Sequence, residues 1–285
     1  MKRQAVLHSA AYALLFVFFT FLFTLVNYPS AKLTSQVNRW VLEASDGALT
    51  VGSARIKSPL SLGIGGLVLK SYLGPLDLGS GAVRLRPLGL LLGKRGVDVR
   101  LENPWLDLNM TIVTSEDGWG LRVRSMELDL SRLPGEFMAL PLDMEGKVEG
   151  AAELQSGDSA KEIGSGEARI DSGPIEVQGE LLDVLGVAPL KISRIFAVAT
   201  VKDNVVTLGE NGIEGDLKAS ARGVIRISPA NYNSSRLDLT VELEPGPGNR
   251  ERLAPVFSLM GARPGGDGGV KIRVRGTLGR PSVTM

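Results

Sequence analysis

The sequence IEGDLKASARGVIRIS, residues 213–228, decides the fold class. Its odd-numbered positions are all apolar or small, whereas seven of its eight even-numbered positions are polar. Alternation with a period of two is typical of a β-strand that is buried on one side. Sixteen residues in one strand would extend for roughly 53 Å, whereas ordinary strands have about 5–6 residues. We therefore predict an unusually long strand with small residues in the middle of its apolar face.

The same alternation recurs along most of the chain after residue 49. It is clearest in residues 83–86, 97–101, 106–112, 121–130, 237–243 and 270–278. A change of phase near Ser125 predicts a β-bulge. Turn residues predict two hairpins, one turning at residues 171–174 and the other at Asp203 and Asn204. Helix signals are few: residues 180–186, and residues 249–261 with Asn249 as the cap and Pro255 as a kink.

These patterns predict a mainly β fold, with one long, curved and mostly antiparallel sheet and few short helices. Small residues such as Gly215 and Gly223 would let the sheet bend sharply or let a ligand approach its apolar face. A sheet that curls around its apolar side forms a trough or half-barrel. The residues that would line this apolar groove are Leu217, Ala219, Ala221, Ile225 and Ile227. The alternative is that the same face is a core filled by a second layer of the protein itself.

The amino terminus predicts a membrane anchor. Residues 5–26 carry no charge at neutral pH, and as a helix they would be about 33 Å long, enough to cross the hydrocarbon core of a bilayer. Lys2 and Arg3 precede this segment, so the amino end is expected in the cytoplasm. The bulk of the anchor consists of Leu14, Phe16, Phe18, Phe19, Phe21, Leu22 and Phe23.

A cleaved signal peptide is the alternative interpretation of this segment. The apolar part of a signal peptide has about 7–15 residues and is followed by a small-x-small cleavage site. Here the apolar segment is longer, and Pro29 occupies the third position before a cut after Ala31. An uncleaved anchor is therefore favoured. His8, the only histidine, lies early in this segment and is interpreted as a neutral residue near the interface.

Three regions follow from these assignments. Residues 1–28 form the cytoplasmic tip and the anchor, residues 29–46 a juxtamembrane amphipathic helix, and residues 47–285 a periplasmic β-rich domain. In the helix, Ser30 is a candidate cap, and Leu33, Val37, Val41 and Ala44 share one face. This helix would cover the start of the sheet or lie along the membrane surface, where Lys32 and Trp40 would suit the interface.

Composition excludes several classes of function. The 285 residues carry a net charge of +1 with basic and acidic residues well mixed, and only 5% of them are aromatic, so a nucleic-acid-binding surface is not expected. Cysteine is absent, which excludes disulfides and thiolate chemistry. With one histidine in the predicted anchor, histidine triads and zinc clusters are not expected either. We therefore expect no enzymatic activity, no cofactor and no metal.

Several segments taken together resemble a known family. These are NYPSAKL after the anchor, LSRLP at residues 130–134, PLDMEGKVEGAAEL at residues 141–154, VKDNVVTLGENGIEGDLKASARGVIRI at residues 201–227, and VKIRVRGTLGRP at residues 270–281. In order and spacing the chain is similar to type II secretion system protein N, also called general secretion pathway protein N. That family looks distantly similar to AsmA-like proteins, and the stretch quoted first is the most AsmA-like part.

The resemblance implies an accessory component of the type II protein secretion machinery in the bacterial inner membrane. Such a protein would span the membrane once and place its β domain in the periplasm. There it would contact other secretion components, for example through exposed strand edges that accept a partner strand. The alternative function is that of an AsmA-like protein, which would bind or transfer lipid, or maintain the envelope, through its apolar groove.

Overall fold

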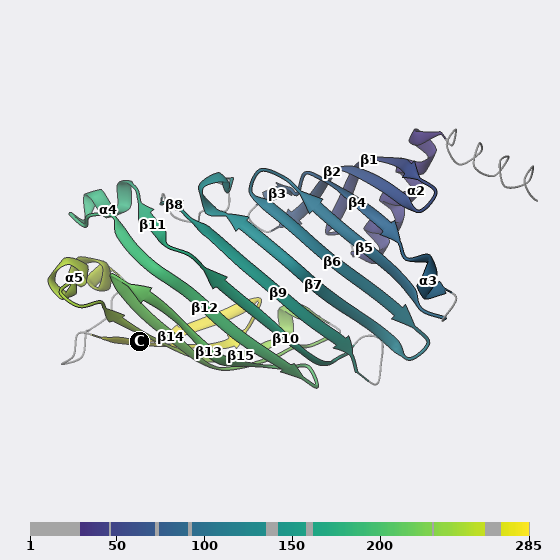
Figure 1. Cartoon of the computed structure of the whole chain (residues 1–285). Coiled ribbons are helices and arrows are strands. Elements are labelled where there is room, and N and C mark those ends of the chain that lie inside the picture. The colour runs from purple at the N-terminus through teal and green to yellow at the C-terminus, as the bar shows by residue number, and fades with distance from the viewer. Residues whose placement is uncertain are drawn as a thin grey trace, which may run out of the picture. The chain divides into compact units, whose positions relative to one another are not determined.

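The computed structural model describes residues 29–45, 47–71, 74–90, 93–134, 142–157, 162–229, 231–259 and 269–284. These residues form antiparallel β-structure with few helices, which confirms the predicted mainly β class (Figure 1). No helix among them has the length and hydropathy needed to span a membrane. The predicted anchor and the topology residues Lys2 and Arg3 lie outside the described residues.

The chain divides into two compact units. The first comprises Met1–Leu88 and Val97–Asn103, and the second comprises Gly89–Gly96 and Pro104–Met285. The elements of the first unit are α2 (Ser30–Ala44), β1 (Leu49–Ser58), β2 (Ser61–Ser71), β3 (Gly74–Asp77), β4 (Ser80–Leu85) and most of β5 (Arg95–Glu102), and the boundary between the units falls within α3 (Pro87–Leu90). Strand β2 pairs with β1, β3 and β4, and β4 pairs with β5, all antiparallel.

Helix α2 covers β1, as one of the two interpretations predicted. The Asn38 side-chain oxygen accepts a hydrogen bond from the Val51 backbone N–H at 2.8 Å, and the Thr34 hydroxyl accepts one from Ala54 N–H at 2.9 Å. Val37 of α2 is buried, whereas Trp40 of the same helix is 61% exposed. The helix thus satisfies backbone donors of β1 that would otherwise face solvent.

The cap prediction for α2 is wrong by one residue. Ser30 is the first residue of the helix, and Pro29 occupies the cap position without a side-chain hydrogen bond. Proline fixes an extended backbone just before the helix, so the start is set by backbone geometry rather than by a capping hydroxyl.

The second unit is a single antiparallel sheet with two short helices. Its elements are β6 (Leu106–Ser115), β7 (Gly118–Asp129), η1 (Leu130–Arg132), β8 (Asp143–Glu145), β9 (Lys147–Ser156), β10 (Ile163–Ser172), β11 (Ile175–Gln178), α4 (Glu180–Val184), β12 (Leu190–Lys202), β13 (Val205–Gly215), β14 (Leu217–Arg226), η3 (Tyr232–Ser234), β15 (Arg236–Pro245), α5 (Arg250–Leu259), β16 (Val270–Thr277) and β17 (Arg280–Thr284). The pairing order is β6–β7–β9–β10–β12–β13–β14–β15–β16–β17, with β8 paired to β11 and β11 to β12.

The single strand predicted over residues 213–228 is wrong. It is divided at Asp216, where β13 ends and β14 begins, and the two strands pair as a hairpin. Gly215 has φ +137°, a conformation that side chains disfavour, and this lets the chain reverse there. Within β14 the predicted alternation is confirmed, because Leu217, Ala219 and Ala221 are half-buried between exposed polar neighbours.

The hairpin predicted at residues 171–174 is also wrong. Strands β10 and β11 both run antiparallel to β12, so the chain continues in the same direction across Gly173 and Pro174. Proline has no backbone N–H and interrupts the ladder. The Ser172 hydroxyl instead accepts a hydrogen bond from Ile195 N–H at 2.8 Å. The interruption is therefore a bend in one long strand.

Two local predictions are confirmed. Asn109 faces Ser125 while Met110 faces Val123, which leaves one extra residue in β7 and makes the expected bulge. Strands β12 and β13 form the expected hairpin, and Asp203 and Asn204 have φ values of 50° and 63°. Two positive φ values in a two-residue loop define a type I′ turn.

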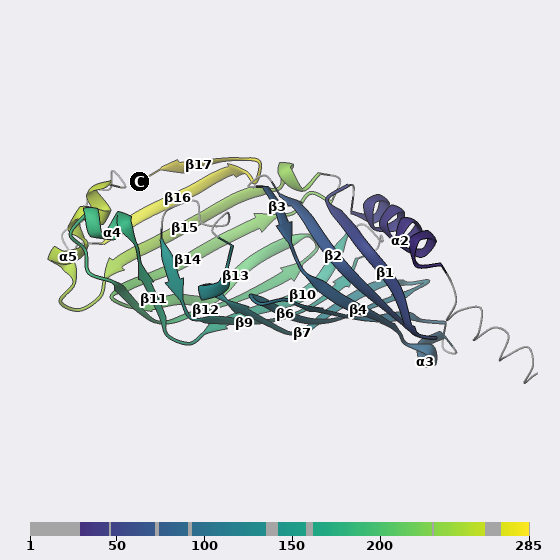
Figure 2. The ribbon, with the colours of Figure 1, turned by 90° about the horizontal axis from the view of Figure 1, so that it is seen from above.

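The core of the second unit lies at the end of the sheet that carries α4 and α5. Leu253 and Phe257 of α5 are 1% and 2% exposed, and they cluster with Ile175 of β11 and Ile272 of β16. Strands β11 and β16 are five positions apart in the pairing order, which is about 24 Å in a flat sheet. The sheet of this unit therefore curls, and Figure 2 shows β16 and β17 on the opposite side of the unit from β9 and β12.

Candidate functional site

One face of the second unit is apolar across all of its long strands. The register places alternate residues of neighbouring strands in line, for example Leu154 opposite Leu121 and Ala168 opposite Ala152. We call this surface the apolar face. Its central residues are Val123, Ala152, Leu154, Gly166, Ala168, Ala197, Ala199, Ala219, Ala221 and Leu239. Seven of these ten residues are glycine or alanine, so the centre leaves more room above the sheet than a surface made only of leucine would.

Side chains on the apolar face are more exposed the farther they lie from α5. Residues next to α4 and α5, such as Ile175, Val270 and Ile272, are buried in the core. The central residues are only half-buried, and Ile170 is 40% exposed. A filled core would bury these side chains, so the described residues leave the centre of this face partly open to solvent.

The five predicted groove residues lie together. Leu217, Ala219, Ala221 and Ile225 occupy one side of β14, on the apolar face, and all four are half-buried. Ile227 follows the end of the strand and is also half-buried. Leu217 packs against the core cluster, so the more open part of this set begins at Ala219.

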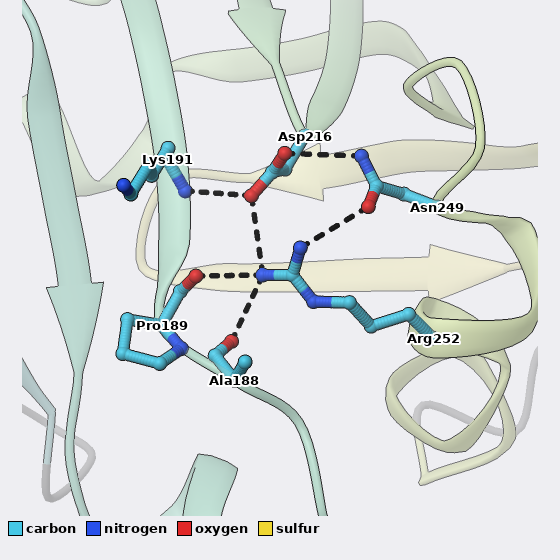
Figure 3. A network of polar contacts seen from close by, with 6 residues as sticks. All are labelled: Ala188, Pro189, Lys191, Asp216, Asn249 and Arg252. Atoms are coloured by element: carbon cyan, nitrogen blue, oxygen red, sulfur yellow. Dashed lines mark hydrogen bonds and ion pairs between the residues drawn. The ribbon is translucent and has the colours of Figure 1, made fainter.

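A polar network attaches α5 to the sheet (Figure 3). The Arg252 guanidinium donates to Asp216 at 3.1 Å and to the backbone oxygens of Ala188 and Pro189 at 3.0 and 2.6 Å. The Asp216 carboxylate also accepts from Lys191 N–H at 2.9 Å and from the Asn249 amide at 3.0 Å. Because these partners come from β12, α5 and the β13–β14 turn, the network fixes the end of the sheet and the helix together.

The network makes stability depend on pH. Burial alone would raise the pKa of Asp216, but the Lys191 N–H and the Arg252 charge outweigh it and hold that pKa below its usual value. A lowered pKa contributes stability that is present above the unfolded value, near 3.8, and is lost as pH falls through the folded value. We expect Asp216→Asn to lower the free energy of unfolding by about 1–2 kcal/mol at pH 7, with a smaller loss near pH 3. Thermal unfolding of the full chain between pH 3 and pH 7 measures this difference.

Asp238→Asn is the matched control for this prediction. The Asp238 carboxylate also pairs with an arginine, Arg275 at 3.2 Å, but the two side chains are 60% and 62% exposed. An exposed pair of this kind contributes little. Equal effects of the two substitutions at pH 7 would contradict the structural role assigned to Asp216.

The opposite face of the sheet is charged, and its charges are uneven. On β7 to β12 opposite charges pair, as in Arg122 with Glu153 at 2.6 Å and Arg194 with Asp171 at 2.6 Å. On β14 to β17 eight cationic side chains stand with three anionic ones. They are Lys218, Arg222, Arg226, Arg236, Lys271, Arg273, Arg275 and Arg280, with Asp238, Glu242 and Glu244.

A groove lined by both polar and apolar residues lies in the first unit. It encloses about 970 Å³ beside the first half of α2 and is lined by β1, β2, β4 and β5. Its lining includes the charged residues Arg55, Lys57, Arg100 and Glu102 and four glycines. The charged side chains in its lining distinguish this groove in chemistry from the apolar face of the second unit, whose central residues carry no charge.

Sequence reasoning located the residues of β14 on the apolar face but missed the uneven charge of the opposite face. The net charge of +1 conceals it, because the excess of cations appears only when the register of four strands is known. Comparison with protein-family models, with curated proteins and with solved structures finds no match to this chain.

Proposed function

We propose that this chain is an accessory component of a type II protein secretion system. Residues 1–28 would anchor it in the bacterial inner membrane with the amino end in the cytoplasm, and the two β units would lie in the periplasm. The order of the segments that resemble type II secretion system protein N supports this assignment, and a mainly β structure is what that resemblance implies.

We further propose that it acts by protein–protein contact. The observation that carries this is an edge strand in the sheet of the second unit. Among the described residues, that strand, β17, pairs only with β16. An edge strand presents unpaired backbone groups on which another chain can build. By contrast, β1 donates backbone hydrogen bonds to side chains of α2.

A deletion strain tests the proposed function. We expect it to lose specific secreted proteins while its outer membrane still resists detergent. A reporter fused after Met285 is expected to be active in the periplasm. Normal secretion combined with detergent sensitivity would overturn the secretion role, and a cytoplasmic reporter would overturn the topology.

The apolar face favours a second candidate, an AsmA-like lipid carrier. In this proposal the curled sheet is a trough, and hydrocarbon chains lie against its small central residues. The supporting observation is that these residues are half-buried outside the core cluster. Covering them with acyl chains would contribute about 25 cal/mol for each Å² of apolar area removed from water.

Charge substitution on β14 tests the lipid proposal. Ala219→Lys places an ammonium group on the apolar face, whereas Ser220→Lys places the same group on the exposed polar face. If the proposal is right, lipid that co-purifies with the full chain in mild detergent falls at least about fivefold in Ala219→Lys, because a buried charge is costly. Mass spectrometry measures the lipid, and Ser220→Lys should retain it. Equal lipid in both variants and the unmodified chain would exclude this role for the face.

A further inference from the structure

Within the part of the chain that the structure describes, β17 pairs with β16 on one side and with no strand on the other. Its five residues, Arg280–Thr284, are all exposed, and Figure 2 shows the strand at a margin of the sheet. It is connected to β16 by a two-residue loop, with Thr277 facing Arg280. Exposed edges are uncommon because they invite indiscriminate pairing, and proteins usually shorten them or place charges and proline on them.

The free backbone groups of this edge follow from its register. Residues that flank a two-residue loop form a hydrogen-bonded pair, and such pairs alternate along an antiparallel ladder. Pro281 and Val283 therefore direct their backbone groups away from β16. Pro281 has no N–H to offer, so the groups available to an added strand are the N–H and C=O of Val283 and the C=O of Pro281.

On the charged face of the sheet, opposite the apolar face, a row of arginines crosses the strands and ends at this edge. Arg226 faces Arg236, Arg236 faces Thr277, and Thr277 faces Arg280. All three arginines are exposed, and none has an ion pair within the described part of the chain. Like charges directly opposite each other destabilise a sheet, so the Arg226–Arg236 pair is unfavourable for the fold by itself.

We propose that β17 accepts an extended segment of a partner protein, with an acidic side chain of that segment beside Arg280, where the arginine row ends. The backbone of that segment would bond to Val283 and Pro281. One carboxylate would lie beside Arg280, and its alternate side chains would be apolar, next to Pro281 and Val283. Arginine suits this role because its planar guanidinium binds a carboxylate with two hydrogen bonds. The inference rests on the proposed function in that both require action by protein contact.

Geometry favours a strand over a membrane surface as the occupant. The arginine row ends at a strand with free backbone donors and acceptors, which an anionic lipid headgroup would not use. On the same strands the carboxylates of Asp238 and Glu242 already bind cations of this face, which leaves less free positive charge for an anionic membrane. A single extended chain placed along β17 would meet Arg280 without covering those carboxylates.

The probe for this proposal is a synthetic peptide of eight residues that alternates glutamate and valine and carries a fluorophore. We expect it to bind the full chain in non-ionic detergent and to raise the fluorescence anisotropy. Replacing its glutamates by glutamine should weaken binding at least about tenfold. A second peptide is N-methylated at the residues whose backbone N–H groups would point toward β17. Its affinity should also fall at least about tenfold, because strand addition needs those N–H groups.

Two protein variants locate the site. Arg280→Glu should weaken binding at least about tenfold, whereas Arg84→Glu, an exposed arginine of β4 in the first unit, should leave binding unchanged. Equal binding to the N-methylated peptide, or to Arg280→Glu, would overturn the proposal. Binding of dihexanoylphosphatidylglycerol that is lost in Arg280→Glu, without any peptide binding, would also overturn it, because that result assigns the row to lipid headgroups.

Secretion and peptide binding can fail separately. If the deletion strain secretes normally while the peptide binds as expected, the secretion assignment fails and the edge site stands. If secretion is lost on deletion but the peptide does not bind, the edge inference fails and the proposed function stands.

Discussion

Replacing Leu253 by alanine is expected to lower the free energy of unfolding of the second unit by about 2–5 kcal/mol. Leu253 is 1% exposed and lies in the core that joins α5 to β11 and β16. The substitution leaves a cavity among neighbours that are fixed by the hydrogen-bonded sheet, so the cavity cannot close fully. Chemical denaturation of the full chain, followed by circular dichroism and hydrogen exchange in β16, measures the loss.

Val184→Ala is the matched control for Leu253→Ala. Val184 lies in the short helix α4 but is 84% exposed, so its substitution should change the free energy of unfolding by no more than about 0.5 kcal/mol. A loss in Leu253→Ala no larger than that of the control would mean that α5 does not close the end of the sheet.

The strands were predictable from the sequence because each one is buried on one side only. Period-two alternation located β14, β15 and β16, and the phase change near Ser125 located the bulge in β7. The β12–β13 turn was predictable too, because Asp203 and Asn204 tolerate positive φ. These features depend only on residues close together in the sequence.

The two wrong strand predictions have a common physical cause. Gly173 and Pro174 look like a reversing turn, and Gly215 looks like a small residue within a strand. Whether such residues bend, reverse or continue the chain depends on the neighbouring strand. β12 pairs with both β10 and β11, so the chain bends at Pro174 but keeps its direction. Contacts with Lys191 and Arg252 hold the reversal at Asp216.

Of the two candidate sites, one was predictable from the sequence and the other was not. The apolar side of β14 was visible in one continuous segment, so its lining residues could be named from the sequence. The arginine row could not, because Arg226, Arg236 and Arg280 become neighbours only through two strand registers and a hairpin. The two faces of the same strands thus support different proposals: hydrocarbon on one side and an acidic strand at the edge of the other.

Gly223→Ala is expected to lower the free energy of unfolding by about 2–4 kcal/mol, although it adds a single methyl group. Gly223 has φ +138° in the middle of β14. A Cβ atom there would collide with the backbone oxygen of Asp238 and would approach Leu239 Cα to 2.9 Å. Neither obstacle is a flexible side chain, so β14 or β15 would have to move. Hydrogen exchange in β14 and β15, together with denaturation of the full chain, measures the effect.

Gly120→Ala is the control that separates the steric clash at Gly223 from the generally low β-strand propensity of alanine. Gly120 also lies within a strand, β7, but a Cβ atom there meets nothing closer than the Leu154 backbone oxygen at 3.9 Å. Alanine is expected to be neutral or slightly stabilising at that position, because it restricts the unfolded chain. If both substitutions were neutral, β15 would not approach β14 as closely as described. Because Ala221 and Leu239 flank this contact on the apolar face, the close approach also sets how much room that face leaves for a ligand.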